Sequence, residues 1–205
     1  MKKMENQPNQ TMDRRCRRTK QAISNAMLEL IQEKPLSSIT VSELADRADI
    51  NRKTFYKHYH DTMAVLDEIE DRIVEKIFSN LNRENVLLDI EDPYPFLCRI
   101  GEGMRVEGPH MRTLIDAGQE TRITQKLDQT VSRMLDSFLQ HNTMIDPTTF
   151  RFFATFLVAG IRSIYIEILM GKTNIPVERY NEMIAELIGH AKKMLRPASH
   201  TAVRF

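Results

Sequence analysis

The segment from Thr40 to Tyr59 constrains the fold of this chain more than any other stretch. It has the sequence TVSELADRADINRKTFYKHY. Thr40 and Glu43 form a Thr-x-x-Glu capping pattern, which predicts the start of a short helix. Asn51 is a good N-cap for a second helix a few residues later. Two helices this close in sequence must be joined by a tight turn, so the segment predicts a helix-turn-helix.

The spacing within this segment supports the same prediction. Ala45 is the small residue needed where the two helices cross, and Ile50 and Phe55 are the apolar residues that hold the second helix against the first. Asp49 stands at the turn, where glycine is more usual. Aspartate tolerates a positive φ better than most residues, so we expect the turn to form at some energetic cost.

The rest of the chain shows helical periodicity. Apolar residues recur at helical spacing over 13–33, 61–77, 119–141, 147–170 and 177–195, and Asp61 and Asp146 are good caps for two of these segments. We expect two shorter helices at 96–106 and 109–117, with Gly108 and Gly118 as their stops. No strand alternation persists, so the fold class is all-α with about nine helices.

Composition limits the compartment and the chemistry. The longest apolar run, Phe152 to Ile161, is shorter than the roughly 20 residues of a membrane span, so no membrane partner is expected. The N-terminus lacks the apolar stretch of a secretory signal. Cys16 and Cys98 have no metal or redox spacing, which favours a reducing, cytoplasmic setting. No catalytic constellation is visible, so we expect no enzyme activity, no cofactor and no metal.

Charge is distributed unevenly along the chain. Residues 1–60 contain 12 Lys+Arg and 7 Asp+Glu, whereas the remaining 145 residues contain 17 and 21. The basic end is the end that carries the predicted helix-turn-helix. A local positive field attracts phosphates even when the whole molecule is nearly neutral, although such clustering also occurs by chance on a solvated face.

The residues following the turn carry a family resemblance. The string ITVSELADRADINRKTFYKHYHD resembles the DNA-binding domain of the tetracycline-repressor (TetR/AcrR) family, with Thr54, Phe55, Tyr56, His58 and Tyr59 at the positions of that family's pattern. The resemblance covers about residues 14–80. The chain departs from the pattern at Asp49, where the family usually has glycine, and at Thr62, where it often has lysine. The second departure removes one expected phosphate contact.

The resemblance implies roles for individual residues. Thr40, Tyr56 and His58, with Thr54 nearby, are expected to contact backbone phosphates. Asn51, Arg52 and Lys53 are the candidates for base edges in the major groove, and Lys57 suits either role. The alternative is that Tyr56 packs against the first helix and that His58 is a core histidine. The basic run at 14–18 has two interpretations, as an arm on the duplex or as a solvated helix start.

The last two helices are apolar enough to need a partner, which predicts a homodimer. The predicted interface residues are Phe153, Leu157, Gly160, Ile161, Ile164, Ile168, Tyr180, Ile184, Leu187 and Ala191. The resemblance also places a ligand pocket between the fourth and seventh helices, for which the candidates are Met104, Met111, Leu114, Met134 and Phe138; ordinary core packing is the alternative. The roles of Arg162 and Glu167 stay open.

The expected organisation follows from these observations. We predict a tail at 1–12, a three-helix helix-turn-helix domain at 13–60, a connecting helix at 61–80, a helical ligand-binding and dimerisation domain at 81–197, and a frayed end at 198–205. The implied function is a dimeric regulator that binds a double-stranded DNA operator, most often a repressor that a small effector releases. The alternatives are a TetR-like regulator or coactivator whose C-terminal domain binds a partner protein, and a small helical enzyme.

Overall fold

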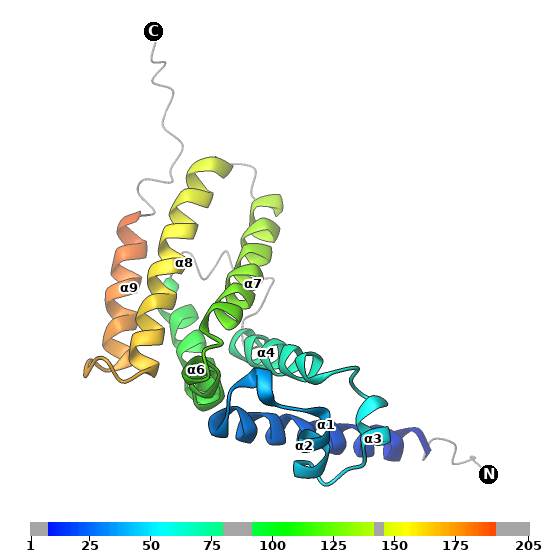
Figure 1. The fold of residues 1–205 in the computed structure, drawn as a ribbon. Helices are drawn as coiled ribbons and strands as arrows, with labels where there is room; N and C mark the ends of the chain where they lie inside the picture. The colour runs from blue at the N-terminus through cyan, green and yellow to red at the C-terminus, as the bar shows by residue number, and fades with distance from the viewer. Residues whose placement is uncertain (1–7, 80–91, 142–145, 192–205) are drawn as a thin grey trace, which may run out of the picture. The chain divides into compact units, whose positions relative to one another are not determined.

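The computed structural model describes residues 8–79, 92–141 and 146–191, and those ranges contain only helices and their connections. The helices are α1 (Pro8–Glu33), a short 3-10 helix η1 (Leu36–Ser38), α2 (Val41–Arg47), α3 (Arg52–Tyr56), α4 (Thr62–Phe78), α6 (Pro93–Asp116), α7 (Glu120–His141), α8 (Pro147–Leu169) and α9 (Val177–Ala191) (Figure 1). The all-α prediction is confirmed, with eight α-helices in the described ranges.

The chain divides into two compact units. The first unit comprises residues 1–72 with 113–120, and the second comprises 73–112 with 121–205. In the first unit, Ile23, Met27, Leu44, Phe55 and Leu66 come from four different helices and are each less than 2% exposed. The helical stripes expected from the sequence therefore supply this core.

Helix α1 begins earlier than predicted. It starts at Pro8, whereas the periodicity indicated Asp13. The five additional residues include a single large apolar side chain, Met12, so they show no apolar periodicity, and proline is well tolerated in the first turn of a helix. As a consequence, the basic run at 14–18 lies inside a helix and is not an extended arm.

The turn between α2 and α3 is a Schellman motif. The Ile50 N–H donates to the carbonyl of Ala45 at 2.9 Å, and the Asp49 N–H donates to that of Asp46 at 3.2 Å. Asp49 has φ 53° and is the one non-glycine residue with positive φ among the described residues. The positive φ expected at this turn is confirmed. Gly118 and Gly171 occupy the equivalent position after α6 and α8, with φ of 77° and 67°.

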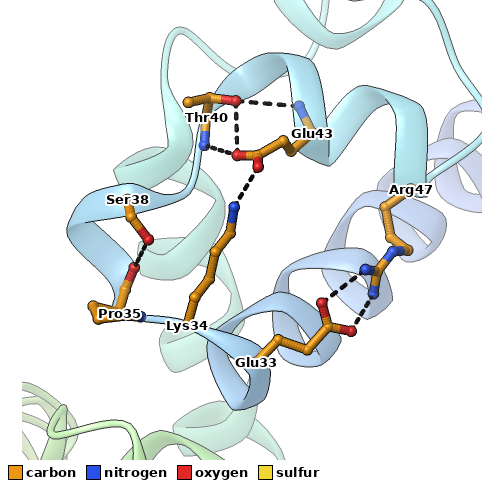
Figure 2. A network of polar contacts seen from close by, with 7 residues as sticks. All are labelled: Glu33, Lys34, Pro35, Ser38, Thr40, Glu43 and Arg47. Atoms are coloured by element: carbon orange, nitrogen blue, oxygen red, sulfur yellow. Dashed lines mark hydrogen bonds and ion pairs between the residues drawn. The ribbon is translucent and has the colours of Figure 1, made fainter.

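The start of α2 is fixed by a polar network (Figure 2). The Thr40 side chain accepts from the Glu43 N–H at 3.3 Å, and the Thr40 N–H donates to Glu43 at 3.0 Å, which completes the predicted capping box. Lys34 donates to the same carboxylate from the end of α1. At the other end of α2, both terminal nitrogens of Arg47 donate to Glu33 at 2.9 Å, so two ion pairs join α1 to α2.

Helix α6 contradicts one prediction. The structure has a single helix from Pro93 to Asp116 where we expected two, with Gly108 as a stop. Pro109 lies inside the helix and removes one backbone donor. Met111 and Leu114, just beyond the proline, are fully buried. Their burial favours continuation of the helix and outweighs the local signal of Gly108-Pro109.

The second unit has an apolar core. Ile73, Ile77, Leu97, Met111 and Ile123 are each at most 1% exposed. Backbones meet where α4 and α6 cross, since a Cβ at Gly103 would lie 2.6 Å from the carbonyl oxygen of Ile77. Only glycine fits this crossing.

Helix α8 is unusual in this unit. By length and composition it is the one described helix apolar enough to cross a membrane, with mean hydropathy 1.7 over its best 18-residue window, and only 11% of that window is buried. The count of consecutive apolar residues did not reveal this, because Arg162 interrupts the run without making the helix polar. A helix of this kind leaves much apolar surface exposed in a single protomer.

We expect substitutions of Asp49 to follow the backbone conformation. Asp49→Gly should be at least as stable as the native chain, because glycine adopts a positive φ without a steric penalty. Asp49→Val should lose about 1–2 kcal/mol of unfolding free energy, because its branched side chain is strained in this region. Urea denaturation of the three proteins measures the order; equal stability of the valine and glycine variants would contradict the assignment.

A second prediction concerns acid. Hydrogen bonds from Lys34 and Thr40 lower the pKa of Glu43 from 4.5 to about 2. A lowered folded-state pKa means that the stabilisation is complete above about pH 4.5 and is lost as the pH falls towards 2. The difference in Tm between the native chain and Glu43→Gln should therefore narrow over that window. Lys34→Met should also reduce this pH-dependent part. A Tm difference that does not change with pH would show that the network contributes no such stabilisation.

Candidate nucleic-acid interface

Helix α3 is held at its inner face and free at its outer faces. Phe55 is fully buried and Tyr59 is 5% exposed, and their rings lie 5.8 Å apart. Tyr56 is 58% exposed, so it does not pack against α1 as the alternative interpretation required. The side chains of Arg52, Lys53 and Lys57 are exposed as well. The helix therefore presents three cations and a phenol to solvent.

Arg52 is positioned by the preceding helix. Its Nε donates to the Ser42 hydroxyl at 3.2 Å, and a second guanidinium nitrogen donates to the same oxygen. Ser42 lies in the first turn of α2, so this contact joins the starts of the two helices. Sequence reasoning missed Ser42. Its position ten residues before Arg52 carries no signal until the turn brings the two helix starts together.

Asn51 and Thr40 each use a side-chain oxygen to cap a helix. Asn51 Oδ1 accepts from the Thr54 N–H at 2.8 Å, which is the predicted N-cap. The Thr40 hydroxyl donates to Glu43 at 2.9 Å while it accepts the Glu43 N–H. The amide N–H groups of Asn51 are not used in the cap, so they can still contact a base. A phosphate contact by the Thr40 hydroxyl would require the capping box to rearrange.

His58 joins the end of the turn after α3 to the basic run of α1. Its Nδ1 lies 3.7 Å from the Cys16 thiol sulfur, and the ring is partly exposed. Arg14, Arg15, Arg17 and Arg18 flank that thiol and are all exposed. The N-terminal part of α1 thus runs beside α3 (Figure 1). We refer to the exposed cations of the two segments together as the basic surface: residues 14, 15, 17, 18, 52, 53 and 57.

Lys20 joins α1 to the residues beneath α3. Lys20 Nζ lies 2.6 Å from Glu68 and 5.4 Å from the centre of the Tyr59 ring. These contacts join α1 to α4 and to Tyr59, which follows α3. Burial raises the pKa of Tyr59, so its ring stays neutral throughout the physiological range.

The predicted pocket residues are only partly brought together. Met104 and Met111 line a cavity of about 110 Å³ between α4, α6, α7 and α8. Met134 is half-buried outside that lining, Leu114 is buried in the other compact unit, and the side chain of Phe138 lies outside the described residues. Arg162 lines the same cavity and pairs with Asp128, while Glu167 is exposed. The cavity is small, and the pocket assignment stays a prediction.

The predicted dimer residues lie on more than one face of their helices. Ile184 is 5% exposed and Ile161 lines the small cavity, so both pack within the protomer. Gly160 and Leu187 are exposed. The most exposed large apolar side chains of α8 are Phe152 and Phe156, at 68% and 67%, with Met183 and Leu187 at 48% and 53% on α9. The sequence pattern could not separate these faces, because α8 is apolar nearly all round.

Comparison with known proteins agrees with this geometry. Residues 23–69 match the sequence profile of the bacterial regulatory proteins of the tetR family. The chain is 32% identical over 78 residues to the uncharacterized HTH-type transcriptional regulator YxbF of Bacillus subtilis (strain 168), a match that covers 38% of this chain and 20% of that protein. The chain thus spans about a fifth of the length of this relative.

Among solved structures, the fold is similar to that of the dihydroxyacetone kinase operon activator DhaS, with a TM-score of 0.56 and 18% identity over 87% of this chain and 98% of that one. This likeness concerns the fold alone. The profile match covers α2, α3 and the buried aromatic residues Phe55 and Tyr59, and it begins after the arginines of α1. Residues 23–69 thus carry the N-terminal helix-turn-helix domain of the tetR family of bacterial regulatory proteins.

Proposed function

We propose that this protein is a homodimeric, sequence-specific DNA-binding transcriptional regulator in the cytoplasm, acting as a repressor that a small effector releases from its operator. The observation that carries the proposal is the exposed cationic face of α3. Its backbone is fixed by the Schellman turn and the Asn51 cap, and Phe55 anchors it from below. A short, rigid helix with cations at its start suits the major groove.

The residues of the interface divide into two roles. Arg52 and Lys53 lie at the start of α3, where the side chains of a recognition helix reach base edges, and arginine and lysine match the acceptors of guanine. Tyr56 and Lys57 lie at the end of α3, and the arginines of α1 flank the cysteine that contacts His58; all of these side chains suit phosphate oxygens. Phosphate contacts supply affinity for every sequence, whereas the base contacts supply the preference for one.

A homodimer follows from the exposed face of α8. Phe152, Phe156 and Gly160 are spaced four residues apart, so they form one stripe on the helix. A Cβ added at Gly160 meets no atom within 4 Å, so packing within the protomer does not require glycine there. A second helix can approach closely at such a position. Helix α9 packs beside α8 and also exposes apolar side chains, which would complete a four-helix interface with a second copy (Figure 1).

A dimer also suits the operator that we propose. Two symmetric copies present two recognition helices to successive major grooves, about 34 Å apart, on a near-palindromic site. An effector changes binding only if it has different affinities for the arrangements that fit and do not fit this spacing.

A second candidate function is favoured by the same exposed face. Phe152 and Phe156 would also suit a different protein, in which case the chain would be a regulator or coactivator controlled by a protein partner. DhaS, whose fold is similar, is named an operon activator. Sedimentation of the purified chain separates the two, because the first candidate requires self-association and the second leaves a monomer that binds its partner.

The base-contact assignment predicts a change in preference. Arg52→Ala combined with Lys53→Ala should reduce the discrimination between a selected duplex and an unrelated one by about tenfold or more, since a good base contact is worth about 1–3 kcal/mol. Tyr56→Phe should weaken binding to both duplexes equally. Fluorescence anisotropy at fixed salt measures both effects, with Lys172→Ala, an exposed lysine between α8 and α9, as the control. Full discrimination by the double variant would refute the assignment.

The dimer assignment predicts that negative charges introduced on the exposed face of α8 dissociate the dimer. Phe152→Glu combined with Phe156→Glu should raise the dimer Kd at least about 100-fold, because the carboxylates would be buried without partners. Val106→Glu places the same charge at an exposed apolar residue of α6 and should leave the dimer intact. Analytical ultracentrifugation over a concentration series gives the constants. An unchanged Kd in the double variant would remove α8 from the interface.

A further inference from the structure

The larger cavity of the second unit adjoins the small one, because Met104 and Tyr165 line both. It has a volume of about 560 Å³ and is lined by residues of α6, α8 and α9. Such a volume is typical of small-molecule sites. Its α8 wall contains Tyr165, Ile168 and Leu169, which lie on the opposite side of the helix from Phe152 and Phe156. The cavity is therefore separate from the face that we assign to the dimer.

Two glycines make room for this cavity. Gly101 and Gly108 are seven residues apart on α6, so they lie on one face of the helix, and both line the space. A Cβ at Gly101 would lie 3.5 Å from both the Asn181 amide nitrogen and the Tyr165 hydroxyl. The absence of a side chain at Gly101 therefore leaves these two polar groups facing open space.

The polar groups at this position are buried and incompletely paired. Asn181 is 3% exposed and Tyr165 is 4% exposed. The Tyr165 hydroxyl lies 2.6 Å from Asn181 Oδ1 and 3.1 Å from the Leu97 carbonyl, so one proton is shared between two acceptors. Among the described residues, the acceptor for the Asn181 amide nitrogen is the Cys98 sulfur, at 3.9 Å. Sulfur is a weak acceptor, so the amide keeps a donor for which an oxygen would be a better partner.

The remainder of the lining favours an uncharged ligand. Met104, Pro109, Ile168, Leu169 and Val177 give it a predominantly apolar wall. The charged side chains around it are two of each sign, Glu102 and Glu178 with Arg105 and Arg112. Arg105 donates to Glu102 at 2.8 and 2.6 Å, so the charges of Arg105 and Glu102 are paired with each other. The lining has no net charge that would favour a charged ligand. The buried Asn181 amide favours a ligand with one oxygen that can accept its hydrogen bond.

We infer that this cavity binds a small, neutral, mainly apolar molecule with one carbonyl oxygen, which accepts a hydrogen bond from the Asn181 amide beside Gly101. The carbonyl replaces the cysteine sulfur as the acceptor, and the apolar body lies along Met104, Ile168 and Leu169. The inference deepens the effector part of the proposed function and rests on it for the link to DNA. Binding of the ligand is measurable without DNA.

The test uses 2-nonanone as the probe and the full chain in titration calorimetry. With about ten non-hydrogen atoms, this ketone should bind saturably with a Kd of roughly 1 mM or tighter. Nonanoate, of equal length but charged, should bind at least about tenfold more weakly, because a carboxylate loses its hydration in an apolar cavity that offers no unpaired cation. Asn181→Leu should weaken the ketone by about fivefold to tenfold, as expected for one lost neutral hydrogen bond.

Two further variants locate the site. Gly101→Ala introduces a methyl group at ordinary contact distance from Asn181 and Tyr165, so the fold should persist while ketone binding weakens. Val131 lines the small cavity between α4, α6, α7 and α8 and does not line the larger one, so Val131→Phe should leave ketone binding unchanged. Circular dichroism and the Tm of each variant establish that it is folded.

The outcomes separate this inference from the proposed function. No saturable heat with 2-nonanone, equal affinity in folded Asn181→Leu, or tighter binding of nonanoate would each overturn the site. Loss of ketone binding in Val131→Phe alone would move it to the other cavity and overturn it as well. Saturable, Asn181-dependent binding by a chain that shows no affinity for any duplex would support the cavity and refute the proposed function.

Discussion

The turn between α2 and α3 sets the position of every residue in the basic surface that α3 contributes. The Ile50 N–H bond to Ala45 closes the turn, and Asp49 takes the left-handed conformation that the closure demands. Asn51 then satisfies the first free backbone donor of α3. A helix of five residues has little stability of its own, so these local bonds and the burial of Phe55 must supply its order. The strained aspartate is tolerated because both flanking helices are fixed by other contacts.

Those other contacts join the helices that surround α3. Lys34 and Arg47 join the two ends of α2 to the end of α1, and Lys20 joins α1 to α4. Exposed pairs of this kind contribute little each, but the Arg47–Glu33 pair is bidentate, and it is part of a network with Glu29. The exposed cations of α3 are thus carried by a framework whose own charges are already neutralised.

Sequence reasoning succeeded where local chemistry decides the backbone. The caps at Thr40, Asn51, Asp61 and Asp146 and the stop at Gly118 were all predictable, because each depends on residues a few positions apart. It failed at Gly108-Pro109, where burial of Met111 and Leu114 overrides the local signal, and at Pro8, where helix continues through residues without an apolar pattern. The contacts of Ser42 with Arg52 and of Cys16 with His58 join separate helices, so spacing could not reveal them.

The account depends most on α3 reading sequence as one of a symmetric pair. Selection of duplexes from a random pool by the native chain, followed by sequencing, tests this directly. The account predicts enrichment of an inverted repeat whose half-site centres lie about one helical turn or a multiple of it apart, with an affinity that falls steeply as salt rises. Recovery of sequences with no shared pattern, or binding that does not depend on salt, would contradict it.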